Sequence, residues 1–237
     1  MSNQPTFSGF PNDTLQFLKD LAANNNREWF KAHEETYHTS VLGPAQAFVI
    51  TLGERLKTIS KGISYDPATN GSGSIMRIYR DIRFSKDKSP YHTHLRITFW
   101  EGSSKKTENP GYFFTMNGNE GILYGGMYMF SKELLETYRQ AVLDPGLGKE
   151  LEAALEAVRG AGKYEIGGDT YKKVPSGYPA EHPRARYLLH TGLHAASPKI
   201  EAKTLSSPAL VDVCYEYAQR MAPIHRWLVQ LIALPAV

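Results

Sequence analysis

The sequence predicts an α+β protein in which a central antiparallel sheet of about four strands is packed by N-terminal and C-terminal helices. Apolar residues recur at helical spacing in the first third of the chain, alternate with polar ones in the middle third, and return to helical spacing in the last third. The links between the middle segments are too short for crossover helices, which favours antiparallel pairing. We expect one domain over residues 1–237, helical at 10–60, with a sheet at 73–130 and helices at 131–235.

Composition limits the class of protein. The chain has 237 residues, 41% of them hydrophobic, and a formal net charge of +3, which excludes a disordered chain. No apolar run reaches the roughly 18–20 residues that a membrane span needs. The N-terminus has no basic start followed by an apolar stretch, and the single cysteine, Cys214, cannot form an internal disulfide. We therefore expect a soluble cytoplasmic protein.

Three helices are predicted near the N-terminus. Asn12 and Asp13 are residues that favour a helix start, and they precede an apolar stripe. Asn25, followed three residues later by Glu28, resembles a capping box and predicts that a second helix starts there. Pro44 suits the first turn of a third helix, whose apolar stripe consists of Phe48, Leu52, Leu56 and Ile59.

Four strands are predicted in the middle of the chain. Residues Ile75–Phe84 and His92–Trp100 alternate between polar and apolar side chains. Residues Tyr112–Met116 and Ile122–Met129 are rich in aromatic residues and are joined across Asn117-Gly118. Because Asn-Gly is a strong signal for a two-residue turn, the last two strands should form a hairpin.

Helices return in the last third. Ser131 can cap one helix, and a second should begin after Pro145. Residues 160–200 look irregular, with one short strand or helix among them. A further helix should start at Ser207, and Pro223 should interrupt it before a terminal helix.

Positive charge is concentrated in one segment of the chain. The segment from Met76 to Arg96 contains six basic and two acidic residues, so its net charge is +4. The net charge of the rest of the chain is therefore −1. In a strand, alternate residues share a face. One face of the first predicted strand would carry Arg77, Tyr79, Asp81 and Arg83, and one face of the next would carry His92, His94, Arg96 and Thr98.

If these two faces lie on the same side of the sheet, they form a concave basic surface. Guanidinium groups match phosphate and carboxylate geometry, so this surface predicts an anion site. Asp81 would hold an arginine in place or act as a base, and His94 would be the acid–base group because its ordinary pKa is near neutrality. The candidate ligand-binding residues are Arg77, Tyr79, Arg80, Arg83, Ser85, Lys86, Lys88, Tyr91, His92 and Arg96.

Two alternatives apply to the same residues. The segment can be an ordinary solvated sheet face with Arg–Asp pairs. His92 and His94 have the strand spacing of some zinc ligands, but the sequence offers no clear third ligand. We therefore expect neither a metal nor another cofactor.

Two motifs carry a resemblance to a known family. They are Asn25–Phe30 (Asn-Asn-Arg-Glu-Trp-Phe) and Arg77–Tyr91 (Arg-Ile-Tyr-Arg-Asp-Ile-Arg-Phe-Ser-Lys-Asp-Lys-Ser-Pro-Tyr). With them the chain resembles, from Phe10 to the terminal helix, the widespread bacterial family called domain of unknown function 2461. The resemblance implies a single domain with no assigned activity and no known catalytic residues. The family pattern has Tyr-Lys-Thr-His after the proline where this chain has Tyr91–His94 (Tyr-His-Thr-His), so no metal site at His92 is implied.

Three functions are compatible with the sequence. The first is an enzyme or binding protein for an anionic small molecule held by the basic segment. The second is a nucleic-acid-binding module that uses the same basic surface, with Tyr79, Phe84, Tyr91 and Trp100 as stacking groups. The third is a protein-interaction role, which a large exposed apolar patch would support.

Overall fold

The computed structural model describes residues 6–102, 106–168 and 170–235. The chain divides into two compact units, which are described in turn; one unit contains Met1–Phe99, Phe113–Leu123 and Lys199–Glu216, and the other contains Trp100–Tyr112, Tyr124–Pro198 and Tyr217–Val237. The single domain that the sequence predicts therefore stays a prediction. Within the described residues, no helix has both the length and the apolar character that crossing a bilayer requires.

The α+β class is confirmed, but the described residues form a sheet of seven strands and not of about four. Four of the strands are only two to four residues long, which is too short for alternation to be recognised in a sequence. The strand order is β1-β2-β3-β4-β6-β5, and β7 pairs antiparallel with β4. The strands are β1 (Ile63–Ser64), β2 (Leu95–Glu101), β3 (Gly111–Met116), β4 (Glu120–Met127), β5 (Glu165–Gly167), β6 (Leu193–Ala196) and β7 (Ile200–Glu201).

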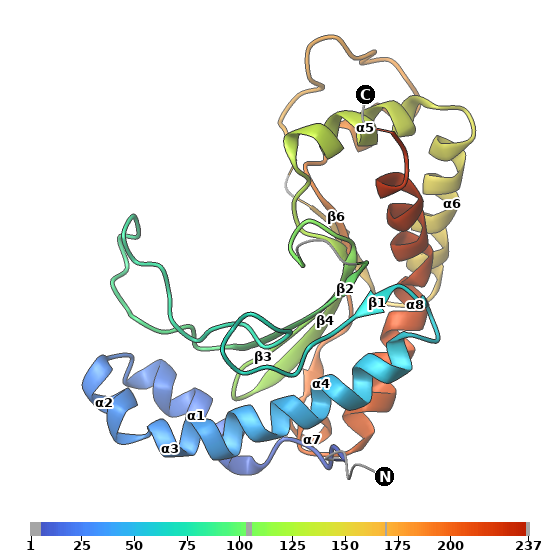
Figure 1. The fold of residues 1–237 in the computed structure, drawn as a ribbon. Coiled ribbons are helices and arrows are strands. Elements are labelled where there is room, and N and C mark those ends of the chain that lie inside the picture. The colour runs from blue at the N-terminus through green and yellow to red at the C-terminus, as the bar shows by residue number, and fades with distance from the viewer. Residues whose placement is uncertain (1–5, 103–105, 169, 236–237) are drawn as a thin grey trace. The chain divides into compact units, whose positions relative to one another are not determined.

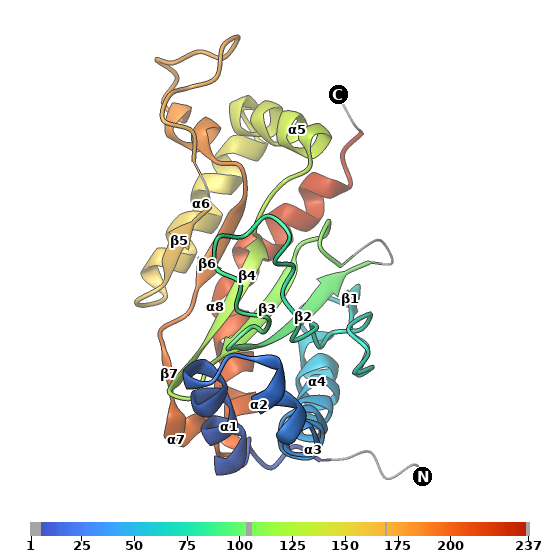
Figure 2. The same cartoon turned by 90° about the vertical axis from the view of Figure 1, so that its left-hand side faces the viewer.

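The first unit begins with a series of helices that follow one another along the chain (Figure 2). Phe48 of α4 packs against Phe114 of β3, with 4.9 Å between the ring centroids, and both side chains are fully buried. Burial of each such side chain contributes about 1.5–3 kcal/mol to stability. The helices are α1 (Asn12–Ala23), α2 (Arg27–Ala32), α3 (Glu34–Thr36), the π-helix η1 (Tyr37–Leu42), α4 (Gly43–Leu56) and, later in the chain, α7 (Ala202–Leu205).

Helix starts in this unit differ in detail from the prediction. The residue that precedes α1 is Pro11, and no side chain caps this helix. The side chain of Asn26, and not that of Asn25, caps α2 by accepting from the backbone N–H of Trp29. Pro44 does lie in the first turn of α4 as predicted.

The strand predicted over residues 75–84 is wrong. Only two isolated bridges form there, between Ile75 and Ile97 and between Tyr79 and Tyr91. The next strand, β2, begins at Leu95, so it does not include the first residues of the predicted strand His92–Trp100. Short polar side chains in this segment bond to nearby backbone groups, and such bonds compete with a sheet ladder.

The β3–β4 hairpin forms as predicted around Asn117 and Gly118. The backbone N–H of Asn117 donates to the carbonyl of Glu120 at 3.0 Å. A Cβ at Gly118 would lie 2.5 Å from the carbonyl oxygen of Leu15 in α1 and 2.3 Å from Cγ of Lys19. Glycine is therefore required where the helix approaches the turn.

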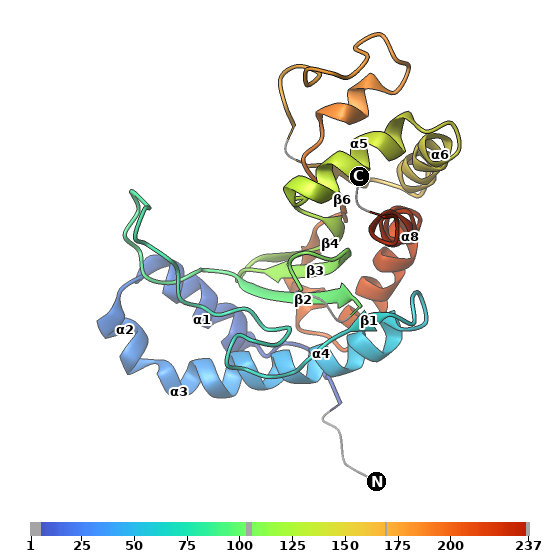
Figure 3. The same ribbon diagram turned by 45° about the horizontal axis from the view of Figure 1, so that its top comes forward.

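The second unit contains α5 (Lys132–Leu143) and α6 (Leu147–Gly160), which lie side by side (Figure 3). Ser131 caps α5 as predicted, by accepting from the N–H of Leu134 at 3.2 Å. The region predicted to be irregular holds β5, β6 and the short 3-10 helix η2 (Ala185–Leu189).

The last helix, α8 (Ala209–Ile232), runs through Pro223, so the predicted interruption is wrong. Proline removes one backbone hydrogen bond from a helix, but the residues on either side, Ala222 and Ile224, are buried and keep their packing. In the second unit this helix packs on β3 through Tyr112, whose hydroxyl donates to the carbonyl of Ala218 at 3.2 Å.

Candidate functional site

The basic segment forms a projecting hairpin-like loop in the first unit, which we call the finger (residues 79–91). Its base is closed by the Tyr79–Tyr91 bridge and by a 2.9 Å hydrogen bond from the N–H of Arg80 to the carbonyl of Pro90. Next to this closure, the backbone N–H of His92 donates to the backbone carbonyl of Ile78 at 2.7 Å. The finger is the blue-green loop that rises above α1 and α2 in Figure 1.

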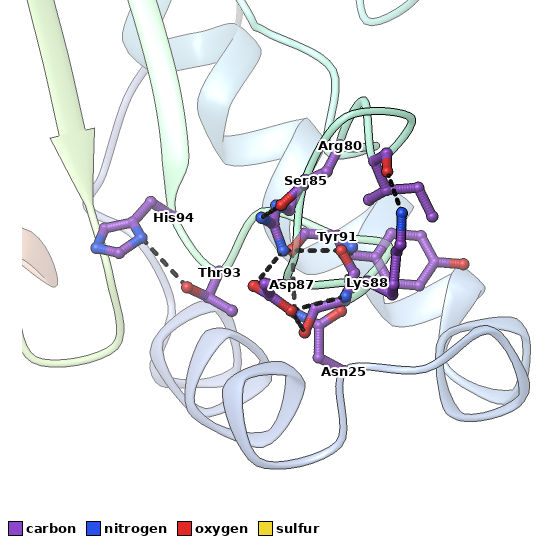
Figure 4. A network of polar contacts seen from close by, with 10 residues as sticks. Asn25, Arg80, Ser85, Asp87, Lys88, Tyr91, Thr93 and His94 are labelled. Carbon is purple, nitrogen blue, oxygen red and sulfur yellow. Dashed lines mark hydrogen bonds and ion pairs between the residues drawn. The ribbon is translucent and has the colours of Figure 1, made fainter.

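Arg80 lies at the centre of the finger and holds it together (Figure 4). Its Nη1 donates to the carboxylate of Asp87 at 2.6 Å and to the carbonyl of Ser89 at 2.9 Å. The Asp87 carboxylate also accepts from the N–H and hydroxyl of Ser89. These bonds from Ser89, followed by the bond from Arg80, lower the pKa of Asp87 to about 2. The finger is thus braced from within.

A second ion pair lies at the exposed end of the finger. Arg83 donates to both carboxylate oxygens of Asp81, with Nη2 at 2.7 Å, and both side chains are exposed. The bond to Arg83 lowers the pKa of Asp81. Of the two roles considered for Asp81, holding an arginine matches this geometry, and action as a base stays a prediction. The remaining finger cations are Lys86, which is exposed, and Lys88, whose Nζ donates to the carbonyl of Ile82 at 3.0 Å.

Asn25 attaches the base of the finger to the start of α2. Its side-chain amide donates to the carbonyl of Tyr91 at 2.9 Å and its side-chain oxygen accepts from the N–H of Tyr91 at 3.1 Å. The ring of Phe30 stacks on the ring of Tyr91 with centroids 4.3 Å apart. The two motifs noted in the sequence therefore meet in space.

A hollow of about 290 Å³ opens between the base of the finger and the end of α1. Most of its lining is polar, and its charged residues are Arg80 and Asp87, which pair with each other. The lining residues are Ala22, Asn25, Arg80, Asp87, Ser89, Tyr91, His92, Thr93 and His94.

Nearby positive charges act on the two histidines of the hollow. Burial, then the charges of Arg96 and Arg80, and then His94 lower the pKa of His92 to about 4. Burial and the charge of Arg96 also lower the pKa of His94. Both imidazoles are therefore neutral at neutral pH. Of these causes, the positive charges of Arg96 and Arg80 favour an anion, whereas burial disfavours a charge of either sign.

Arg96, on β2, is the source of much of this field. Its guanidinium is half-buried, and burial lowers its pKa. Its Nη2 donates to the backbone carbonyl of Arg77 at 2.9 Å. Over the described ranges of the chain, no carboxylate pairs with it. Tyr37 at the start of η1 interacts with Arg96, but burial holds the pKa of this phenol at about 12, so it is uncharged at neutral pH.

The structure brings together only part of the predicted site. Arg80, Tyr91, His92 and His94 line the hollow, and Arg96 acts on it through its charge. Six sequence candidates lie outside this lining on exposed surface: Arg77, Tyr79, Asp81, Arg83, Lys86 and Lys88. Ser85 accepts from Nη2 of Arg80 at 3.5 Å within the finger.

Four polar residues of the hollow were not predicted: Asn25, Asp87, Ser89 and Thr93. Asn25 belongs to the first sequence motif, and its position there was the available signal. Within the residues that the structure describes, no group of three or more His, Cys, Asp or Glu side chains is arranged to hold a metal ion.

The fold and the site define an α+β protein with a polar hollow at the base of a braced basic loop. The chain matches, over residues 13–227, the family model described as conserved hypothetical protein (DUF2461), and it belongs to that family. No curated protein matches the chain.

Proposed function

We propose that this protein binds a small anion, bearing a phosphate or a carboxylate, in the hollow beside His92 and His94. The observation that carries the proposal is the half-buried guanidinium of Arg96, which has a carbonyl as its hydrogen-bond partner and, within the described residues, no carboxylate. A partly buried charge without a counter-charge is costly, and an anion in the neighbouring hollow would supply one.

The neighbouring groups suit the same ligand. The Arg80 guanidinium is fixed by Asp87 and Ser89, so its position in the wall of the hollow is set before a ligand arrives. Neutral imidazoles at His92 and His94 can each donate one N–H to an anion, and the negative charge would favour a second proton on either ring. His94 is exposed at this site, so it is the acid–base group if the bound anion is a substrate.

A cytoplasmic location fits this role. Cys214, the single cysteine, is a fully buried free thiol, and burial raises its pKa well above the ordinary thiol value. Such a thiol is a core residue and neither a nucleophile nor half of a disulfide.

The nucleic-acid alternative has less support. A backbone-tracking surface needs several cations that are available to phosphates. Two of the finger cations, Arg80 and Arg83, are already paired with Asp87 and Asp81. Lys86 and Arg77 are exposed, which would give one or two phosphate contacts and a salt slope of about −0.7 to −1.4 for a single strand.

Thermal unfolding with added ligands tests the proposal. Inorganic phosphate or sulfate should raise the melting temperature, because a ligand at a hundredfold excess over its dissociation constant stabilises the folded state by about 2.7 kcal/mol. An uncharged solute at the same concentration should not. No shift with any small anion, together with tight oligonucleotide binding that collapses with salt, would favour the nucleic-acid alternative.

A further inference from the structure

The tip of the finger presents an aromatic side chain to solvent. Phe84 is 95% exposed, and the guanidinium carbon of Arg83 lies 5.8 Å from its ring centroid. Single exposed apolar residues are common on protein surfaces, so exposure alone assigns no role. Here, however, the loop that carries Phe84 is braced by the Arg80 and Asp87 bonds. A preordered loop loses little entropy on binding, which is the property of an anchor residue.

The charges around Phe84 favour a protein partner over a nucleic acid. Arg83 is bound to Asp81, and Lys88 donates to a carbonyl of the finger itself. Few cations of the finger therefore remain to bind a phosphate backbone. The single ring of Phe84 could stack on only one base. An aromatic anchor with polar and charged side chains at its rim is typical of an energetic centre in a protein–protein interface. Since the finger has four basic and two acidic residues, its partner should be apolar with negative charge nearby.

The same chain offers a receptor with this chemistry in its second unit. A hollow of about 490 Å³ lies at the end of α5 and the start of α6. Its only charged lining residue, within the described part of the chain, is Asp144. An aromatic side chain needs less room than this hollow provides. Its apolar walls are Ala141, Leu143, Leu147, Leu234 and Pro235.

We propose that Phe84 of one copy of this protein inserts into the α5–α6 hollow of a second copy. The contact joins two different surfaces, so it is heterologous, and association continues beyond a dimer unless the geometry closes a ring. This proposal does not rest on anion binding, because neither Phe84 nor the α5–α6 hollow belongs to the site at His92 and His94.

Light scattering during size-exclusion chromatography, over protein concentrations up to about 1 mM, measures the association. The mass of the wild-type chain should rise with concentration. Phe84→Ser should weaken association by roughly tenfold or more, as loss of an anchor residue does. Tyr128→Ser is the matched control, because Tyr128 is another exposed aromatic residue, at 73%, and lies outside the α5–α6 hollow. It should associate as the wild type does.

The receptor side is tested at Gln140, an exposed lining residue of the hollow. Gln140→Arg adds bulk and positive charge that oppose the basic finger, so it should also weaken association. Gln140→Glu, at the same position with the opposite charge, should preserve or strengthen it. Both substitutions remove the exposed 3.1 Å bond from Gln140 to Glu136, but they place good helix formers on the exposed side of α5, so folding should be retained, which circular dichroism checks.

Mixing the two defective variants gives the sharpest result. The Phe84→Ser chain keeps an intact hollow and the Gln140→Arg chain keeps an intact finger, so an equimolar mixture should form 1:1 pairs although neither variant associates alone. The proposal is overturned if the wild type stays monomeric at every concentration, if the mixture stays monomeric, or if Phe84→Ser instead abolishes binding to a single-stranded oligothymidine and leaves the protein's mass unchanged.

Discussion

Asn25 satisfies both backbone hydrogen-bonding groups of Tyr91 with its side chain, through bonds of 2.9 and 3.1 Å. This pair joins the connection between α1 and α2 to the base of the finger, across 66 residues of sequence. Because Tyr91 is buried, loss of the amide would leave an N–H and a C=O without partners where water has little access.

We therefore expect Asn25→Ala to reduce the free energy of unfolding by about 1–3 kcal/mol. Asn24→Ala is the control, since the Asn24 amide makes one exposed bond to the carbonyl of Asp20. It should change stability by about 0.5 kcal/mol or less. Urea denaturation measures both, and equal effects of the two substitutions would show that the Asn25–Tyr91 pair contributes little.

The hydrogen bonds that brace the finger should protect its backbone amides from hydrogen exchange. Asp87→Ala removes the carboxylate that joins Arg80 to Ser89, so amides of the finger should exchange with solvent faster. Global stability should hardly change, because Asp87 itself is exposed. Hydrogen exchange with mass spectrometry tests this expectation, with Asp81→Ala, at the exposed tip, as the comparison. A finger that exchanges no faster in Asp87→Ala would contradict the bracing.

Stability should depend on pH through His92. Its pKa in the folded chain, about 4, lies below the ordinary histidine value of 6.5. Between these values the unfolded chain binds the proton more readily, so folding stability should fall as the pH drops from about 6.5 to about 4. His92→Gln should flatten this part of the profile, whereas substitution of the exposed His38 should not. Parallel profiles for the wild type and His92→Gln would contradict this assignment.

Gly118 should tolerate no side chain. Gly118→Ala places a Cβ 2.5 Å from the carbonyl oxygen of Leu15, which is backbone and cannot move alone, so we expect a loss of about 1–3 kcal/mol. Gly160→Ala, where a Cβ meets nothing within 4 Å, should be neutral or slightly stabilising. Thermal unfolding of both variants makes the comparison.

Features of the fold with a local chemical cause could be predicted from the sequence. The cap at Ser131, the proline at the start of α4 and the Asn117-Gly118 turn each depend on a residue and its immediate neighbours. The strand over residues 75–84 was predicted from alternation, but side chains such as Asp81 and Asp87 bond to nearby backbone instead. The short strands contain too few residues for an alternation of polar and apolar side chains to be recognised.

For the candidate site too, features with a local cause could be predicted and tertiary contacts could not. His92, His94 and Arg80 were expected from charge and spacing, and they do line one hollow. Sequence analysis expected Asp81 to hold an arginine, but the choice of Arg83 as its partner could not be predicted, because it depends on a loop conformation that replaced the expected strand. Asn25 lies far from these residues in sequence, and its contact with Tyr91 is a tertiary feature.

Calorimetric titration of inorganic phosphate into Arg96→Gln and Arg83→Gln tests the central proposal most directly. Arg96 is the half-buried guanidinium beside the hollow, and Arg83 is an exposed one paired with Asp81, so both variants lose one positive charge. We expect Arg96→Gln to weaken phosphate binding by roughly tenfold or more, the effect of losing a nearby positive charge in a partly buried site, and Arg83→Gln to bind as the wild type does. Equal affinities in all three proteins, or no phosphate binding by the wild type, would contradict an anion site at this hollow.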